Sequence, residues 1–497
     1  MSHAAPTVDR LPLGLKLSWA TGALGVALLM NGISALMLLY MVSVLRMEPW
    51  LAGTLLMITR FYDAFSDPIA GAMSDNAKPS KMGRRRPFLL WGAVISAISF
   101  FLCLAAPFQG PFAEALQGQG LLAAAYMLGV LLLYSTGYSL FNVPYMAMPG
   151  EMTDGYHERS SIHGYRVMLA SLGGMLAQSG SMVVIGVVGG NAGRQGVGPD
   201  DWTSFAAIGA VGGVLIFITM MVTFFGTRSA RQIAATERVM PWKAQVSAFI
   251  GNGPFMKILS IKFLQLLGLS FSTAALAFMT INIVGLNPAK LAFVGVSMTV
   301  TVLLFTQPLM MLGKVIGKQG GYILSTMCTV AVAVSWSWES AGTVADWELI
   351  ARGVVNGIAF AGNVAFAMSM LTDAMELDAH RTGMRREGMF TALYSFVEKF
   401  AAAIGPFVVG LALSAAGFDP QKPPAEVTDA VRQAVLLGVT YAPAICMLAS
   451  IAILATYKLD EKALQEARAK GVRPDTGAPQ DVADAIAAPA VGELKNR

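Results

Sequence analysis

Three charged side chains lie in a stretch of sequence that is otherwise apolar enough to cross a membrane. Arg60, Asp63 and Asp67 fall within residues 50–73, which read WLAGTLLMITRFYDAFSDPIAGAM. About 20 apolar residues in a helix suffice to span the hydrocarbon core. Spacings of three and four residues place the three charges on one helical face. Charged groups at that depth turn towards protein or water rather than lipid.

The charges on this face do not balance. One arginine cannot neutralise two carboxylates, and an unpaired carboxylate inside a membrane costs several kcal/mol. The pattern therefore predicts an ion pair together with a carboxylate that accepts a mobile cation. A purely structural ion-pair network, which would hold this helix to its neighbours, is the alternative that the residues leave open.

The composition indicates a polytopic membrane protein. The chain has 497 residues, of which 55% are hydrophobic and only 13% are charged, and a soluble protein of this size would carry more charge. The formal net charge is +5. The basic residues cluster in loops without interleaved aromatic residues, so we expect no nucleic-acid partner. Anionic lipid headgroups are sufficient to explain them.

No arrangement of residues indicates an enzyme or a bound cofactor. Cys103, Cys328 and Cys446 lie in apolar runs without metal-ligand spacing, and the histidines are scattered along the chain. No nucleophile and base occur in a recognisable pattern. We therefore expect no catalytic residue, no cofactor and no metal other than a coupling cation, and no obligate protein partner is evident.

The apolar runs predict an all-α chain with about twelve membrane-spanning helices. The expected helices cover residues 14–42, 48–73, 88–107, 120–148, 163–189, 203–226, 256–284, 289–312, 320–338, 346–372, 386–416 and 431–457. Lysine and arginine concentrate in the even-numbered loops, for example at Arg84, Arg228 and Lys314. The positive-inside rule then places both termini in the cytoplasm, and we expect an integral protein of the bacterial inner membrane.

The longest internal connection divides the chain into two halves. We expect an N-terminal six-helix bundle at residues 1–226, a cytoplasmic loop at 227–255 and a C-terminal six-helix bundle at 256–457. Turns rich in glycine and basic residues follow the second and the eighth helix, as in the repeated halves of transporters. The cytoplasmic tail at 458–497 begins as a charged amphipathic stretch and becomes rich in proline and alanine, which predicts partial disorder.

Five segments, in order along the chain, carry a family resemblance. They are RFYDAFSDPIAG at residues 60–71, GRRRP at 83–87, NVPY at 142–145, ERSSIHGYR at 158–166 and GMRREGMFTALYSFVEK at 383–399. The chain up to its tail resembles the major facilitator superfamily, and within it the glycoside-pentoside-hexuronide:cation symporters, the group that contains the melibiose permease. The resemblance implies two six-helix bundles that open a central site to either side of the membrane in turn.

The resemblance also implies roles for several polar residues. The family's cation site matches Asp63 and Asp67, with a hydroxyl group that falls at Ser139. The family's helix-eleven lysine matches Lys399, which would neutralise the carboxylates when the cation leaves, and its helix-five arginine matches Arg166. With Arg60, these two basic residues form the expected coupling or charge-pair set.

Each of these assignments has a plainer alternative. The Ser139 hydroxyl could bond its own helix backbone instead of a cation. Lys399 could extend to the cytoplasmic edge of the membrane, and Arg166 could contact lipid headgroups. Lys262, near the expected cytoplasmic end of the seventh helix, is also expected to extend to the headgroups.

The family's sugar-binding residues are not preserved. The helix-one aspartate falls on Ala27, the helix-four aspartate on Asn142 and the tryptophan beside the galactoside on Met146. The loss of this clamp argues against melibiose and towards a different or more apolar substrate. The candidate substrate contacts are Trp19, Asn31, Tyr62, Asn142, Tyr145, Met146, Asn363 and Tyr394, for each of which packing is the alternative.

The residues and the resemblance together predict a symporter, driven by Na+ or H+, that imports a glycoside, pentoside or hexuronide. The first alternative is a cation-coupled transporter of an amphipathic lipid-like or other hydrophobic solute. The second is a membrane receptor or scaffold that does not transport. The expected partners are a small-molecule substrate, the coupling cation and membrane lipids.

Overall fold

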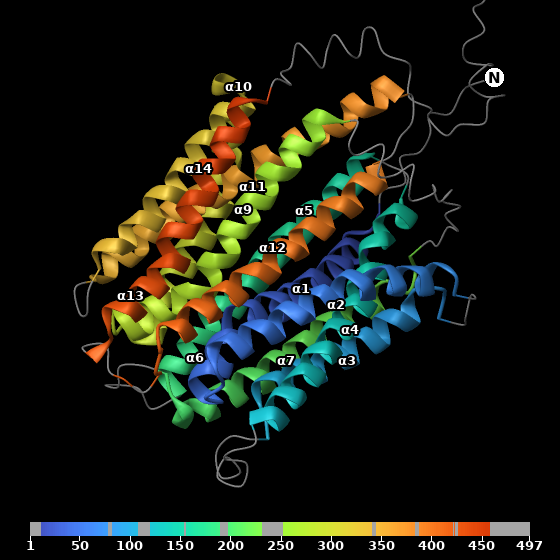
Figure 1. Ribbon diagram of the computed structural model, residues 1–497. Helices are drawn as coiled ribbons and strands as arrows, with labels where there is room; N and C mark the ends of the chain where they lie inside the picture. Colours follow the sequence, from blue (N-terminus) through green and yellow to red (C-terminus); the bar gives the residue numbers. More distant parts are fainter. Residues whose placement is uncertain are drawn as a thin grey trace, which may run out of the picture.

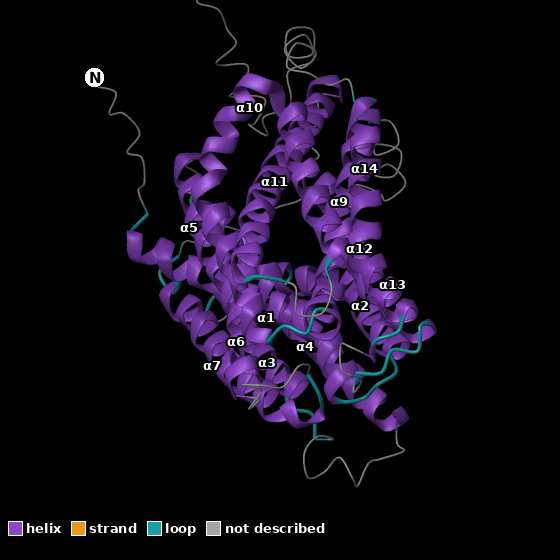
Figure 2. Ribbon diagram, turned by 90° about the vertical axis from the view of Figure 1, so that its left-hand side faces the viewer, coloured by secondary structure: helices purple, strands orange, loops and turns teal. Residues whose placement is uncertain are grey.

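The computed structural model describes the chain at residues 11–77, 82–107, 120–153, 156–188, 197–230, 252–339, 344–382, 387–420, 422 and 426–457. These residues form helices joined by turns, and no β-strand occurs among them (Figure 2). A helix satisfies its own backbone N–H and C=O groups, which lipid cannot do. The predicted all-α fold class is confirmed.

The first set of helices precedes residue 231. Its members are α1 at Leu13–Leu39, α2 at Pro49–Asp75, α3 at Arg86–Leu104, α4 at Gly120–Met152, α5 at Tyr156–Met175, α6 at Ser181–Val188 and α7 at Trp202–Gly226. A π-helical turn at Leu176–Gly180 joins α5 to α6, so these two helices form one span. Each predicted span in this half matches one of these elements.

The second set of helices follows residue 251. Its members are α9 at Gly253–Phe278, α10 at Leu291–Ser335, α11 at Asp346–Thr382, α12 at Glu387–Ala415, α13 at Asp429–Leu436 and α14 at Ala442–Ala455. The backbone of α10 leaves the helical conformation at Gly317, where φ is 79° and ψ is 160°. Glycine adopts this conformation without steric cost, and the two predicted spans at 289–312 and 320–338 lie on either side of it.

Membrane-spanning length and composition agree with the prediction. Ten described segments are long and apolar enough to cross a membrane. One of these segments, Pro288–Trp338, contains the two spans on either side of Gly317. The helix α2 is not among the ten, because its charged face lowers its hydropathy, although it is long enough to cross a membrane. The described helices thus match all twelve predicted spans.

Packing is denser within each set of helices than between the sets. In the first set α1 packs against α5 and α7, and α3 packs against α4 and α7; in the second, α9 packs against α12 and α14, and α10 against α11. The most extensive contact between the sets joins α2 and α12, which run side by side in Figure 1. The connecting loop falls largely outside the described residues, as does the tail, so the boundary at 227–255 stays a prediction.

The two sets make tight contacts where α2 begins and where α6 ends. A Cβ atom at Gly53 would lie 2.6 Å from the Pro406 carbonyl oxygen of α12. A Cβ atom at Gly186 would lie 2.7 Å from the backbone nitrogen of Ala289, in the short turn at Pro288–Lys290 that precedes α10. Real Cβ contacts are longer than this, so only glycine permits these approaches. Because successive spans alternate in direction, both contacts lie at the same end of the helices, and the two sets are closed against each other there.

Candidate functional site

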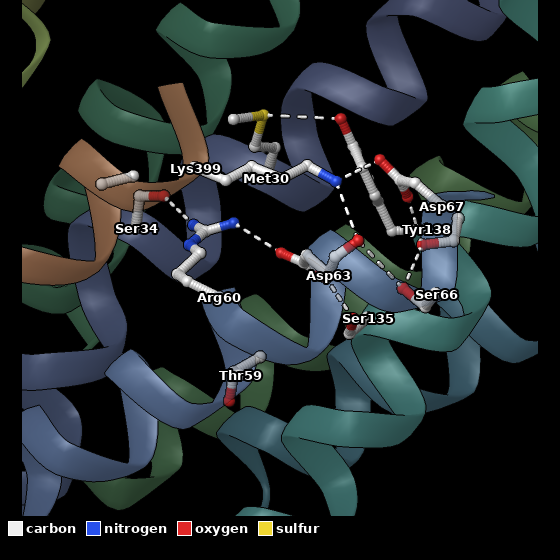
Figure 3. A network of polar contacts seen from close by, with 12 residues as sticks. Met30, Ser34, Thr59, Arg60, Asp63, Ser66, Asp67, Ser135, Tyr138 and Lys399 are labelled. Atoms are coloured by element: carbon white, nitrogen blue, oxygen red, sulfur yellow. Dashed lines mark hydrogen bonds and ion pairs between the residues drawn. The ribbon is translucent and has the colours of Figure 1, made fainter. Parts of the chain in front are cut away.

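The charged face of α2 lies at the contact between the two sets of helices (Figure 3). Arg60 Nη1 lies 3.3 Å from Asp63 Oδ2, and Arg60 Nη2 donates to Ser34 Oγ of α1 at 2.9 Å. The Asp63 side chain is only 2% exposed. The predicted ion pair on this face is therefore present and nearly buried.

Hydroxyl groups of α4 complete the surroundings of both carboxylates. Ser135 Oγ donates to Asp63 Oδ1, the carboxylate oxygen that does not pair with Arg60, and Ser139 Oγ donates to Asp67 Oδ1 at 2.5 Å. Ser66 Oγ lies 2.8 Å from Ser139 Oγ. Residues four apart on a helix share a face, so the pair 135 and 139 on α4 faces the pair 63 and 67 on α2 in register.

Sequence reasoning had singled out only one of the two α4 hydroxyls. Ser139 lies beside Asp67, as the resemblance implied, while Ser135 was missed. The spacing of four between Ser135 and Ser139, equal to that between the two carboxylates, was the signal that could have found it.

Lys399 reaches from α12 to the carboxylates of α2. Its Nζ forms an ion pair with Asp67 Oδ2 and donates to the backbone oxygen of Asp63 at 3.0 Å. The side chains of Lys399 and Asp67 are 18% and 24% exposed. The structure thus places the Lys399 ammonium group on the carboxylates of α2, and each carboxylate has one basic partner.

The cluster has the chemistry of a site for a small hard cation. Two carboxylates and the hydroxyls of Ser66, Ser135 and Ser139 converge on a small volume, and oxygen atoms are the ligands that hard cations prefer. Protonation of one carboxylate would neutralise its charge as a bound metal cation would. Either cation would compete with the Lys399 ammonium group for Asp67.

A cavity of about 500 Å³ lies beside this cluster, between the two sets of helices. Its polar lining residues include Asn31, Ser34, Arg60, Arg166, Gln178, Thr299 and Glu398. Its apolar lining residues include Leu266, Leu269, Met298, Val302 and Phe360, all from α9, α10 and α11. The volume is typical of a pocket for a small organic molecule. The first set of helices contributes both polar and apolar lining residues, and the lining residues of the second set are mostly apolar.

Of the eight candidate substrate contacts, Asn31 is the one that lines this cavity in the described structure. Trp19 and Tyr145 are fully buried and stack on each other at a ring distance of 4.6 Å. The Trp19 Nε1 also donates to the Tyr145 backbone oxygen at 3.2 Å. The cavity is not lined by this pair, which holds α1 against α4.

The remaining candidates also have neighbours away from the cavity. Asn142 Nδ2 donates to the Tyr138 hydroxyl at 3.1 Å, and the Tyr62 hydroxyl lies 3.0 Å from Thr136 Oγ1. The Met146 side chain is 38% exposed and is not among the lining residues of the cavity. Asn363 bonds Thr326 and Thr329 at 2.8 and 3.0 Å, which joins α11 to α10.

The sequence did not predict the polar cluster that Lys262 and Gln265 of α9 form with Glu398 of α12. Lys262 is 2% exposed, so the expectation that it extends to the headgroups is wrong. Its Nζ donates to Gln265 Oε1 at 2.9 Å and lies 5.9 Å from the centre of the Tyr394 ring. Lys262 interacts electrostatically with Glu398, which lines the cavity. A lysine and a glutamine three residues apart in an apolar helix were the available signal.

Arg166 of α5 also lines the cavity. Its Nε is buried without a hydrogen-bond partner, and the structure shows no ion pair between Arg166 and any carboxylate among the described residues. The role of Arg166 in a coupling charge pair stays a prediction.

Comparisons with known proteins agree with this architecture. Residues 18–461 match the model of a family described as MFS/sugar transport protein. The isoprimeverose transporter of Lactiplantibacillus pentosus is 25% identical over 413 residues, which are 82% of this chain and 82% of the relative. The sodium-dependent lysophosphatidylcholine symporter 1 of Mus musculus is 22% identical and covers 91% of this chain and 87% of its own length.

Solved structures resemble the chain in fold. A structure of a proton-dependent oligopeptide transporter superposes with a TM-score of 0.62 at 12% identity, over 92% of this chain and 99% of that one. At this identity the likeness establishes only the fold, which is that of the major facilitator superfamily. Because the family model covers most of the chain, the protein belongs to the MFS/sugar transport protein family, whose members are membrane transporters and not enzymes.

Proposed function

We propose that the protein is a cation-coupled symporter that uses Na+ or H+ to import a glycoside, pentoside or hexuronide. The family and the isoprimeverose transporter among its relatives support a sugar-like substrate. The oxygen-rich cluster at Asp63 and Asp67 supports a coupling cation. The substrate would bind in the adjacent cavity, and membrane lipids would surround the helices.

The observation that carries this proposal is the ion pair between Lys399 of α12 and Asp67 of α2. It joins the two sets of helices at the proposed cation site. A cation that binds Asp67 displaces the Lys399 ammonium group and so weakens an attraction between the two sets. Cation binding then changes the free energy of moving one bundle against the other, which is what coupling in alternating access requires.

The closed end of the helices fits an inward-facing state. We propose a bacterial inner-membrane location with both termini cytoplasmic, so the start of α2 lies at the outer face. The tight approaches at Gly53 and Gly186 would then seal the cavity from the outside. The two bundles proposed to rock are residues 1–226 and 256–457.

A second candidate function is transport of an amphipathic solute. The cavity wall formed by Leu266, Met298, Val302 and Phe360 is apolar, and one relative is a lysophosphatidylcholine symporter. The cation cluster would serve this substrate in the same way. The two candidates differ only in what occupies the cavity.

Substrate class is tested by ligand-induced thermal stabilisation of the purified protein, because a ligand that binds the folded state raises its unfolding temperature. Hexoses, pentoses and hexuronates are compared with lysolipids. Stabilisation by sugars supports the first candidate, and stabilisation by lysolipids alone would replace it with the second.

Coupling is tested by uptake of the stabilising solute into vesicles with an imposed Na+ or H+ gradient. We expect accumulation in the wild type and loss of accumulation in Asp63→Asn and Asp67→Asn. Asp346→Asn is the matched control. The Asp346 side chain is 53% exposed and forms an ion pair of 2.6 Å with Lys290, and neither residue lines the cavity. Wild-type accumulation in both Asp63→Asn and Asp67→Asn would refute the coupling proposal.

A further inference from the structure

The charged side chains around the cavity pair off with one exception. Arg60 pairs with Asp63, and Lys399 pairs with Asp67. Both pairs are neutral, so neither leaves a net charge for a substrate to balance. A cation that displaces Lys399 from Asp67 adds one positive charge to this cluster and leaves the Lys399 ammonium group without that partner, so it supplies no negative charge for any other basic group.

The third acidic group near the cavity also has a basic neighbour. Glu398 lines the cavity and interacts electrostatically with the buried Lys262 of α9, as well as with Lys399 and Arg60. Since Arg60 and Lys399 are already engaged by Asp63 and Asp67, Lys262 is the cation that balances Glu398. The α9 and α12 side of the cavity is therefore neutral as well.

Arg166 remains as the unbalanced charge. It lines the same cavity from α5, its Nε has no hydrogen-bond partner, and no acidic side chain among the described residues forms an ion pair with it. Glu158, two turns earlier on α5, pairs with Lys16 of α1 at 2.6 Å. A guanidinium group in a partly enclosed cavity with a largely apolar opposite wall attracts an anion more strongly than it would in water.

We propose that the substrate carries an anionic group, a carboxylate, sulfonate or phosphate, which binds the Arg166 guanidinium. The planar guanidinium donates two parallel hydrogen bonds to such a group. Asn31 of α1 and Gln178, just after α5, line the cavity and supply further polar contacts. This inference rests on the proposed transport function and narrows its substrate: an acidic sugar or an acidic amphiphile satisfies it, and a neutral sugar does not.

The test compares, within each pair, an anionic probe with a neutral probe of the same carbon skeleton. Methyl glucuronide is paired with methyl glucoside, and octanesulfonate with octanol, so the first pair represents an acidic sugar and the second an acidic amphiphile. Binding to the full chain in nanodiscs of zwitterionic lipid is measured by intrinsic tryptophan fluorescence and thermal unfolding. The variants are Arg166→Gln, Arg166→Lys and, as a matched control, Arg228→Gln, because Arg228 is exposed at the end of α7.

In the wild type and in Arg228→Gln we expect the anionic member of at least one pair to bind about tenfold more tightly than the neutral one. Arg166→Gln abolishes this preference. Arg166→Lys, which keeps the charge but not the planar fork, weakens anion binding several-fold; if Arg166→Gln does not fold, this variant carries the comparison.

The inference is overturned if the wild type binds both members of each pair equally or binds neither anion. It is also overturned if the preference for the anion persists in Arg166→Gln, or if anion binding is as tight in Arg166→Lys as in the wild type. The response of the same samples to Na+ and H+ is recorded in parallel. A cation response without any anion preference would refute the anionic substrate while the coupling proposal stands.

Discussion

Replacement of Lys399 by methionine removes the ammonium group that competes with the coupling cation for Asp67. Methionine keeps an unbranched apolar stem of similar length and removes the ammonium group. In the wild type this group forms an ion pair with Asp67 and donates to the Asp63 backbone oxygen at 3.0 Å. A coupling cation must displace this interaction, so Lys399→Met is expected to raise the apparent affinity for the cation.

The structure sets the size of this effect. The side chains of Lys399 and Asp67 are 18% and 24% exposed, so the pair lies between an exposed pair, which contributes about 0–1 kcal/mol, and a buried one, whose disruption costs about 3–5 kcal/mol. We take about 1–3 kcal/mol. That free energy corresponds to an increase in cation affinity of about 5- to 150-fold.

The assay is thermal unfolding of the purified protein over a range of Na+ concentrations and of pH. Without the cation, Lys399→Met unfolds at a lower temperature than the wild type, because Asp67 is left without a basic partner. As the cation is added, stability is recovered at a lower cation concentration than the wild type requires. Lys290→Met, at a pair whose side chains are 42% and 53% exposed, is the matched control and leaves the cation response unchanged.

The reasoning fails if the cation response of Lys399→Met has the same midpoint as that of the wild type. It also fails if the variant is no less stable without the cation. Either result would mean that Lys399 does not compete for Asp67.

Ser135, Gly53 and Arg352 each make a contact whose loss has a measurable consequence. Ser135→Ala removes the hydroxyl that donates to Asp63 and is expected to weaken cation binding about fivefold in the same titration; an unchanged midpoint would exclude this serine from the site. Gly53→Ala places a Cβ atom 2.6 Å from the Pro406 carbonyl oxygen and is expected to destabilise the closed end by about 1–3 kcal/mol, which spin-label distances between α2 and α12 would show as a longer separation. Arg352→Gln breaks a pair with Glu339 whose side chains are 10% and 11% exposed and is expected to cost about 3–5 kcal/mol of stability, so unfolding at the wild-type temperature would contradict it.

The positions of the spans could be predicted because lipid leaves the chain few choices. Only helices satisfy the backbone in a membrane, so the length of each apolar run fixes each span. The spans on either side of Gly317 were separated correctly because glycine and lysine interrupt the apolar pattern between them. The π-helical turn at Leu176–Gly180 leaves no such signature, since its residues are as compatible with an ordinary helix.

The charges on α2 predicted that the site needs ionic partners, and the family resemblance identified Lys399 as one of them. Arg60, Asp63 and Asp67 had to find partners, and the structure brings Lys399 to them from more than three hundred residues away in the sequence. Charge in an apolar segment is a strong constraint because its burial is costly. Lys262 obeys the same rule, but its partners lie on its own helix and on α12, and the expectation that it reached the headgroups ignored Gln265.

The substrate part of the site could not be predicted in the same way. Aromatic and amide side chains serve packing as well as binding, and a single sequence does not distinguish the two. Trp19 and Tyr145 form a stacked pair inside the first set of helices, and Asn363 joins α11 to α10. The cavity is lined instead by residues such as Gln178 and Thr299, whose helices meet only after the two sets have packed together.

The most direct test of the account is a titration of the purified protein in nanodiscs with Na+ at constant pH and with H+ at constant Na+, read by intrinsic tryptophan fluorescence. The account predicts that the wild type and Asp346→Asn respond to at least one of the two cations and that Asp67→Asn loses that response. A response in both Asp63→Asn and Asp67→Asn equal to that of the wild type would contradict the claim that these carboxylates bind the coupling cation.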